Sequence, residues 1–409
     1  MRHRQPSCVR VAAVAAIVTA AAAGCGNSAG TTPHAAPAET STSSTPPPTV
    51  IGGGASNDSG TQVLMERGAM IARRGTSVSV YDPTSGNLRW RGDNIRLSPD
   101  RRTAVETDVA AGAETIVVRD VDTGVAHATW PQQSRRELVA VSTHGELAAL
   151  VDPLTIDDAT GMPQGRTTSH IDIVDLLTGS LRRSFTLPGN LVPETIDAQS
   201  GLGVVEYTPS DHPDRYRVRH LELVTGQLTN VLTRDKTEIV DDMYGYGRSA
   251  VASSDGQTLF TLYHQSGGGN GSFIHQLLQG GLFAFCIDLP ADGYRNTNAL
   301  TLSPDDNTLY VAGTDGRVAV LGSRDANGAF GNELLSERQI HGPRGEPKAI
   351  AASATSLWLL ADGKVWQVDR TNNAILDHFD VGADARGLGV SADETTRYVV
   401  TSSGTTIRF

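Results

Sequence analysis

The sequence predicts an all-β protein built from a repeated unit, and two observations carry that prediction. Short segments of alternating polar and apolar residues, separated by turn-forming residues, follow one another along most of the chain, which is typical of β-strands joined by tight turns. No segment shows the length and period of a long amphipathic helix. The second observation is a recurring unit, clearest as "ALTLSPDDNTLYVAGTDGRVAVLG" (Ala299–Gly322), and such self-similarity indicates a repeat architecture.

This unit divides into strands in a definite order. Ala299–Leu302 is a short apolar strand, and the Pro and Asp residues of Ser303–Asp306 favour a turn after it. Leu309–Ala312 is the second strand, and Asp315-Gly316 is a signal for a tight hairpin. Arg317–Leu321 alternates polar and apolar residues as the third strand, and we expect a fourth strand after a loop.

The same order of strands and turns recurs along the chain. A turn of the type seen in "VDLLTG" (Val174–Gly179) and "LELVTG" (Leu221–Gly226) often follows the third strand. The count is eight units if the two terminal units are separate and seven if they merge. The units lie near 62–90, 95–130, 138–187, 193–232, 245–290, 298–335, 347–381 and at Gly387–Phe409.

The stretch "SPDDNTLYVAGTDGRVAVL" resembles the β-propeller repeats named for a Tyr-Val-Thr-Asn motif, which lie near the WD-repeat and quinoprotein-like propellers. The resemblance extends over about Val63 to Phe409 and implies a β-propeller of four-stranded blades. The Trp-Asp and Gly-His dipeptides of true WD repeats are absent. A solenoid is the alternative architecture. Propellers host many unrelated activities, so the resemblance implies a fold rather than a function.

The two ends of the repeat region predict how the ring closes. The last unit, Gly387–Phe409, stops after its third strand, and the first unit has a weak first strand. We therefore expect N- and C-terminal strands to pair in one sheet, because closure removes exposed strand edges.

The N-terminus has the pattern of an export signal. Arg2, Arg4 and Arg10 precede the uncharged apolar run Val11–Ala23, which is shorter than the roughly 20 residues of a spanning helix. The residues that follow resemble the lipobox of bacterial lipoproteins, although Ala22 stands where that family usually has Leu. The resemblance implies a signal peptide over residues 1–25, lipidation of Cys25 and anchoring at the extracytoplasmic face of the cell membrane. A plain secretory signal is the alternative.

Residues 26–60 are rich in Ser, Thr, Pro, Ala and Gly and predict a disordered tether before a propeller at residues 61–409. The net charge of −11 argues against a nucleic-acid partner. Once Cys8 and Cys25 are set aside, only Cys286 remains, so no intrachain disulfide is expected. The abundance of Ala, Gly and Arg, with only three lysines, is typical of a GC-rich bacterial source such as an actinobacterium.

Three departures from the minimal unit are candidate sites, because insertions in repeats often carry function. The insertion Asp152–His170 has neighbouring acids but lacks the spacing of a calcium loop, and a solvated hairpin is the favoured interpretation. His264 and His275 flank a Gly-rich loop and, with Asp288, could form a zinc or copper site. Surface histidines on a hairpin are the alternative, and no other cofactor is expected.

The third departure, "EIVDDMYGYG" (Glu238–Gly247), places aromatic residues beside carboxylates and predicts a ligand-binding rim. Paired acids also occur in glycosidases, but neighbouring residues of a strand point to opposite faces, which argues against joint catalysis. The predicted binding residues are Asp241, Asp242, Tyr244 and Tyr246.

The leading hypothesis is a lipid-anchored binding module for a protein, glycan or small molecule at the central mouth of the ring. The sequence contains no Gly-x-Ser-x-Gly elbow, no His-Glu-x-x-His zinc helix and no dinucleotide-binding loop after a strand. An enzyme, either a lactonase-like hydrolase or a quinoprotein-like oxidoreductase, is the second hypothesis, and a metal-binding carrier is the third.

Overall fold

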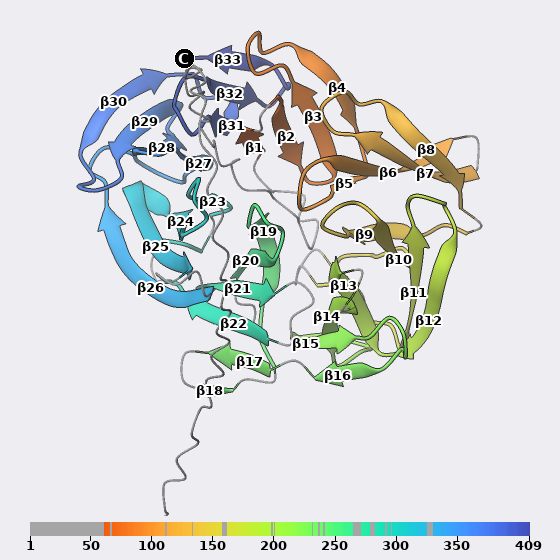
Figure 1. Cartoon of the computed structure of the whole chain (residues 1–409). Helices are drawn as coiled ribbons and strands as arrows, with labels where there is room; N and C mark the ends of the chain where they lie inside the picture. The colour runs from red at the N-terminus through yellow and green to blue at the C-terminus, as the bar shows by residue number, and fades with distance from the viewer. Residues whose placement is uncertain are drawn as a thin grey trace, which may run out of the picture. The chain divides into compact units, whose positions relative to one another are not determined.

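The computed structural model describes residues 61–409 except 66–67, 111–112, 133, 158–161, 198, 200, 231, 236–237, 240–241, 265–270, 279–282, 291–292, 296 and 325–329. The described residues form eight sheets arranged as the blades of a ring, and neighbouring strands are antiparallel except for one pair, so the chain is an eight-bladed β-propeller (Figure 1). The only helical element in this part of the chain is the short 3₁₀ turn η1 (Thr314–Gly316). None of the described helical structure is long and apolar enough to cross a membrane.

The eight blades succeed one another in chain order, and the two terminal units form separate blades. The number of blades is therefore eight rather than seven. In chain order, the strands of blades 1 to 4 are β1 (Gln62–Met65), β2 (Met70–Arg74), β3 (Ser77–Tyr81), β4 (Leu88–Gly92); β5 (Ile95–Leu97), β6 (Thr103–Ala110), β7 (Ala113–Asp120), β8 (Ala126–Pro131); β9 (Glu137–Val141), β10 (Leu147–Val151), β11 (Thr168–Asp175), β12 (Leu181–Pro188); β13 (Asn190–Asp197), β14 (Gly201–Thr208), β15 (Arg215–Leu221) and β16 (Leu228–Asn230).

The connection from blade 4 to blade 5 adds two strands to the outside of blade 5, because β17 pairs in parallel with β22. The remaining strands are β17 (Leu232–Asp235), β18 (Glu238–Ile239), β19 (Tyr246–Ala252), β20 (Thr258–His264), β21 (Ser272–Leu278), β22 (Phe283–Asp288); β23 (Leu300–Leu302), β24 (Thr308–Ala312), β25 (Arg317–Arg324), β26 (Phe330–Gln339); β27 (Ala349–Ala352), β28 (Ser356–Ala361), β29 (Lys364–Asp369), β30 (Ile375–Asp380); β31 (Ala385–Val390), β32 (Arg397–Thr401) and β33 (Thr406–Arg408).

The position of a strand within its blade explains its composition. The second strand of blade 3, β10, reads Leu-Ala-Ala-Leu-Val and is buried throughout, because blades cover both of its faces. The outer strand β12 is polar and largely exposed. The buried apolar clusters join neighbouring blades, as where Val105 and Ile116 of blade 2 pack with Leu150 of blade 3.

A recurring contact holds the outer strands of successive blades together. The ring of Trp90 in blade 1 covers Gly124 in the turn between the third and fourth strands of blade 2, and Trp130 covers Gly179 of blade 3 in the same way. Each indole nitrogen donates a hydrogen bond to a carbonyl of the covered turn, from Trp90 Nε1 at 2.7 Å and from Trp130 Nε1 at 3.3 Å. The repeated Thr-Gly turns therefore act as docking points between blades.

The ring closes differently from the prediction. β1 lies in the sheet of blade 1, and the sheet of blade 8 contains only β31, β32 and β33 among the described residues. Closure occurs by packing of blade 1 on blade 8. The Tyr81 hydroxyl donates to the Gly404 carbonyl at 2.8 Å, and the Tyr398 hydroxyl donates to the Thr84 carbonyl at 3.1 Å. The predicted pairing of terminal strands in one sheet is thus wrong for the described residues, because blade 1 supplies all four of its own strands.

Candidate functional site

One face of the ring collects the irregular segments of the chain. Since strands alternate in direction within each blade, every connection between blades emerges on the same face as the hairpin between second and third strands. We call this the connection face. The described parts of the insertion Asp152–His170, of the hairpin Tyr263–His275 and of the segment 238–246 all belong to it.

A polar hollow opens on the connection face where blades 1, 2 and 3 meet. Its volume is about 320 Å³, at the lower end of the range of about 300–1,000 Å³ found for small-molecule sites. Blade 1 contributes Thr76, and the rest of the wall comes from the beginning and second hairpin of blade 2, from the connection into blade 3 with the start of β9, and from the loop after β10. Those lining residues are Asn94, Arg96, Thr107, Glu114, Arg135, Arg136, Glu137, Leu138 and Pro153.

Backbone hydrogen bonds fix the wall between blades 1 and 2. The Ile95 amide donates to the Thr76 carbonyl at 2.9 Å, and the Thr107 amide donates to the Asn94 carbonyl at 3.2 Å. Asn94 has a φ of 53°, a left-handed conformation that Asn tolerates better than most residues. This turn directs the chain from the outer edge of blade 1 into the inner strand β5, and it presents Arg96 at the hollow.

Two arginines are buried at and behind the hollow. Arg73 and Arg96 are each only 8% exposed. Burial, together with the neighbouring charge of Arg96, lowers the pKa of Arg73 to about 9. Burial also lowers the pKa of Arg96, while Glu137 acts in the opposite direction. Buried cations require compensating charge or hydrogen bonds, and the protein supplies acceptors for both: Arg73 Nε donates to the Gly75 carbonyl at 2.8 Å and Arg96 Nε to the Leu138 carbonyl at 3.3 Å.

Arg136 is held in place by the carboxylates of blade 3. Its Nε donates to Asp172 Oδ2 at 3.0 Å, and its Nη1 pairs with Asp152. Asp152 also contacts His170 Nδ1 at 2.6 Å, and Ser184 Oγ donates to Asp172 at 2.6 Å. The two ends of the insertion, Asp152 and His170, therefore join a charged network beside the hollow. Within the insertion, Ile156 and Pro163 form an antiparallel bridge, and residues 158–161 between them lie outside the described residues.

Two glutamates face the hollow, and each uses one oxygen to hold backbone. Glu114 Oε2 accepts a hydrogen bond from the Arg136 amide at 3.0 Å, and Glu137 Oε2 accepts one from the Leu154 amide at 2.8 Å. The hollow thus carries cations and carboxylates set on strands and tight connections. Such a fixed arrangement can orient a small polar ligand without first reorganising the protein.

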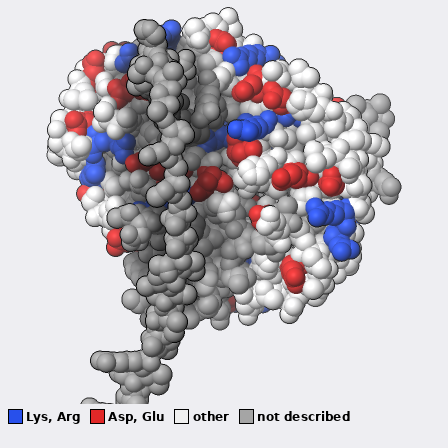
Figure 2. Space-filling view, in the orientation of Figure 1, with Lys and Arg blue, Asp and Glu red and all other residues white. Residues whose placement is uncertain are grey.

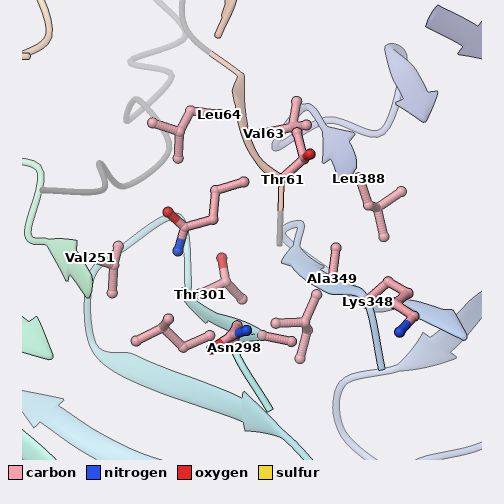
Figure 3. Close-up of a pocket in the computed structure, with 13 residues that line it drawn as sticks. Thr61, Val63, Leu64, Val251, Asn298, Thr301, Lys348, Ala349 and Leu388 are labelled. Carbon is pink, nitrogen blue, oxygen red and sulfur yellow. The ribbon is translucent and has the colours of Figure 1, made fainter. Parts of the chain in front are cut away.

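A second hollow lies at the central channel between the inner strands of blades 1, 5, 6, 7 and 8 (Figure 3). Its walls are mainly apolar, as with Val63, Leu64 and Leu388, while Asn298 and Lys348 supply polar groups. Its volume is only about 30 Å³, which suits a water molecule rather than a ligand. Of the two hollows, the one among blades 1 to 3 is therefore large enough for a small molecule.

The surface charge is mixed on the face shown in Figure 2. Lys and Arg side chains alternate with Asp and Glu over the visible described residues, and no continuous basic field appears there.

The structure does not bring the predicted metal ligands together. His264 and His275 lie on opposite faces of one sheet: His264 contacts the Thr297 carbonyl toward blade 6, whereas His275 packs on Tyr216 of blade 4. Asp288 pairs in register with Phe273. No group of three or more His, Cys, Asp or Glu side chains in the described ranges could hold a metal ion.

The predicted binding rim is divided between two places. Asp242 and Tyr244 both lie against Arg215, whose guanidinium is 3.7 Å from Asp242 Oδ2 and 5.9 Å from the Tyr244 ring centroid. Tyr246 instead contacts Arg248 and the ring of His264, 6.3 Å away between centroids. Asp241 and Cys25 lie outside the described residues.

Sequence reasoning missed the residues of the larger hollow. They come from five separate stretches and form no linear motif. Two signals were present in the sequence: Arg96 interrupts the otherwise apolar inner strand Ile95–Leu97, and Ser134–Glu137 concentrates charge at the start of blade 3. A charged residue in a strand buried on both sides indicates a specific partner or ligand.

The fold and the hollow together define the class of protein: an eight-bladed β-propeller with a polar, ligand-sized hollow on its connection face.

No family model and no curated protein sequence matches the chain. Solved structures that the chain resembles include BamB from Moraxella catarrhalis (16% identity, TM-score 0.43, covering 88% of this chain and 100% of that one). A Kuenenia stuttgartiensis hydrazine synthase chain has 13% identity and a TM-score of 0.44, covering 92% of this chain and 98% of that one. The Dos1 propeller has 12% identity and a TM-score of 0.47, covering 87% and 94%. Likenesses at this level concern the fold alone.

Proposed function

We propose that this chain is a binding module, moored by lipid at the extracytoplasmic face of the cell membrane, that holds a small polar ligand in the hollow of blades 1 to 3. The observation that carries the binding role is a hollow of about 320 Å³ walled by buried Arg96 and by Glu137 on rigid strand ends. The lipobox-like stretch before Cys25 supports the mooring. No observation in the described residues favours an enzyme over a binding module.

A substitution that fills the hollow with a large side chain tests the binding role. Thr76 sits half-buried in a hairpin at its rim, so Thr76→Trp should fill the hollow with little disturbance of the blade. We expect small polar compounds to raise the melting temperature of the wild-type protein, as ligands that bind only the native state do. The plugged variant should lose that response.

Thr314→Trp is the matched control, because Thr314 occupies the corresponding hairpin of blade 6, outside the lining of the hollow. It should respond to ligand as the wild type does. An equal response of Thr76→Trp would mean that binding occurs elsewhere.

The anchor has a separate test. Cys25→Ser removes the thiol that lipidation requires, so the protein should move from the membrane fraction to the soluble fraction. Each buried methylene group of an acyl chain contributes about 0.8 kcal/mol to membrane binding, so two chains hold a protein on the membrane stably. Cys8→Ser, which changes the other cysteine of the leader, should leave the protein in the membrane. Retention of the Cys25→Ser protein would refute lipid anchoring at this position.

A further inference from the structure

The charged groups around the hollow differ in whether the protein already satisfies them. Arg136 is fully engaged by Asp152 and Asp172. Arg96 donates to the Leu138 carbonyl at 3.3 Å. By contrast, the exposed guanidinium of Arg135 has no hydrogen bond or ion pair within the described residues. It is therefore available to an incoming group.

The two glutamates are each half satisfied. The Oε2 atoms of Glu114 and Glu137 hold backbone amides. Their Oε1 atoms have no hydrogen-bond partner in the part of the chain that the structure describes. The hollow thus offers negatively charged hydrogen-bond acceptors, the two carboxylates, and a positively charged hydrogen-bond donor, the guanidinium of Arg135.

This combination restricts the ligand. A purely anionic molecule would gain from Arg135 and Arg96 but would face the carboxylates of Glu114 and Glu137. A purely cationic molecule would face the arginines. A molecule that carries both charges can pair with the arginines and with the glutamates. Charged groups in a partly desolvated site give specificity because they repel ligands of like charge.

We infer, on the basis of the binding role proposed above, that the ligand is a small zwitterion carrying a carboxylate and an ammonium group close together. Arg135 binds the carboxylate of the ligand, and Arg96 adds positive charge at the wall of the hollow. The Oε1 atoms of Glu114 and Glu137 accept hydrogen bonds from the ammonium group. Free α-amino acids and the ends of short peptides share this chemistry. The volume of about 320 Å³ fits molecules of that size.

Isothermal titration calorimetry on the full lipid-free propeller tests the inference. The probes are the α-amino acids, a set of dipeptides, and for each the N-acetyl and carboxamide forms that lack one charge. At least one zwitterion should bind with a Kd below about 1 mM, and blocking either charge should weaken it at least about tenfold, since one charge-assisted contact is lost. The amino-acid and dipeptide arms distinguish the two sources.

Arg135→Gln should weaken the best zwitterion about tenfold or more, because a charge-assisted hydrogen bond is lost. Arg344→Gln is the matched control: Arg344 is also an exposed arginine on a connection between blades, away from the hollow. It should leave the affinity unchanged. Arg135→Lys should restore part of the affinity by restoring the charge.

Two results would overturn the inference in distinguishable ways. If inorganic phosphate or an N-acetylated compound binds as tightly as any zwitterion, and Thr76→Trp abolishes that binding, the hollow is a binding site but the ligand is not a zwitterion. If none of the zwitterionic or singly charged probes binds, or if Thr76→Trp leaves the binding intact, both the ligand class and the proposed site are wrong.

Discussion

Replacing Gly179 with alanine is expected to lower the free energy of unfolding by about 3 kcal/mol. Gly179 has a φ of 68°, and a side chain in this left-handed region costs about 1–2 kcal/mol. An added Cβ would also lie 2.1 Å from the indole of Trp130, so the ring must leave the turn it covers. Forcing atoms into a packed contact costs a further ~1–3 kcal/mol. Denaturant unfolding followed by tryptophan fluorescence would measure the change.

Gly75→Ala separates the two causes. Gly75 has a similar φ of 60°, but an added Cβ would meet nothing within 4 Å. This variant should lose only the strain of about 1 kcal/mol. If the two variants were equally stable, the contact between Trp130 and the neighbouring turn would have no energetic role in holding the blades together.

The second large effect concerns a buried carboxyl between blades 4 and 5. Glu194 is 7% exposed and accepts a hydrogen bond from the Tyr263 hydroxyl at 3.0 Å. Burial raises the pKa of Glu194 to about 7, although the bond from Tyr263 acts to lower it. Between pH 4.5 and 7 the folded protein therefore binds a proton that the unfolded chain does not. Stability contributed by this group must fall as the pH rises through that window.

Glu194→Gln should remove this loss. Relative to wild type, the variant should gain about 3 kcal/mol of stability between about pH 4.5 and pH 8, because a pKa difference of 2.5 units corresponds to about 3 kcal/mol. His264 and His275 have pKa values lowered to about 4 by burial, and they titrate with the opposite sign. The difference between variant and wild type cancels their contribution.

Glu333→Gln provides the control, since Glu333 is an exposed carboxylate on β26. Its stability difference from wild type should stay flat over the same pH range. A flat difference for Glu194→Gln as well would show that this carboxyl is not protonated in the folded protein at neutral pH.

The repeated unit made most of the fold predictable. The strands expected at Leu309–Ala312 and Arg317–Leu321 correspond to β24 and β25. The expected Asp315-Gly316 hairpin is confirmed, with φ values of 55° and 77° at its two residues. Tight turns between alternating strands depend on local sequence, which is why their positions could be read residue by residue. The number of blades could not be predicted from the sequence, because it depends on how the first and last repeat units pack together.

The residues that line the larger hollow could not be predicted from the sequence, for a physical reason. A binding hollow in a propeller is assembled from the ends of strands in several blades, and no spacing along the chain reveals which ends meet. Arg96 and Glu137 are 41 positions apart, yet they lie on neighbouring inner strands at one hollow. The metal hypothesis had a different weakness. His264 and His275 lie on paired strands, and their register places them on opposite faces.

Binding of a small zwitterion in the hollow of blades 1 to 3 is tested most directly by mass spectrometry of the molecules released on denaturing protein that has been equilibrated with an extract of its own source. Wild-type protein and Thr314→Trp should release the same small compound with both an acidic and a basic group, and Thr76→Trp should release none. Equal release from the plugged variant, or a released compound lacking either charge, would contradict the account.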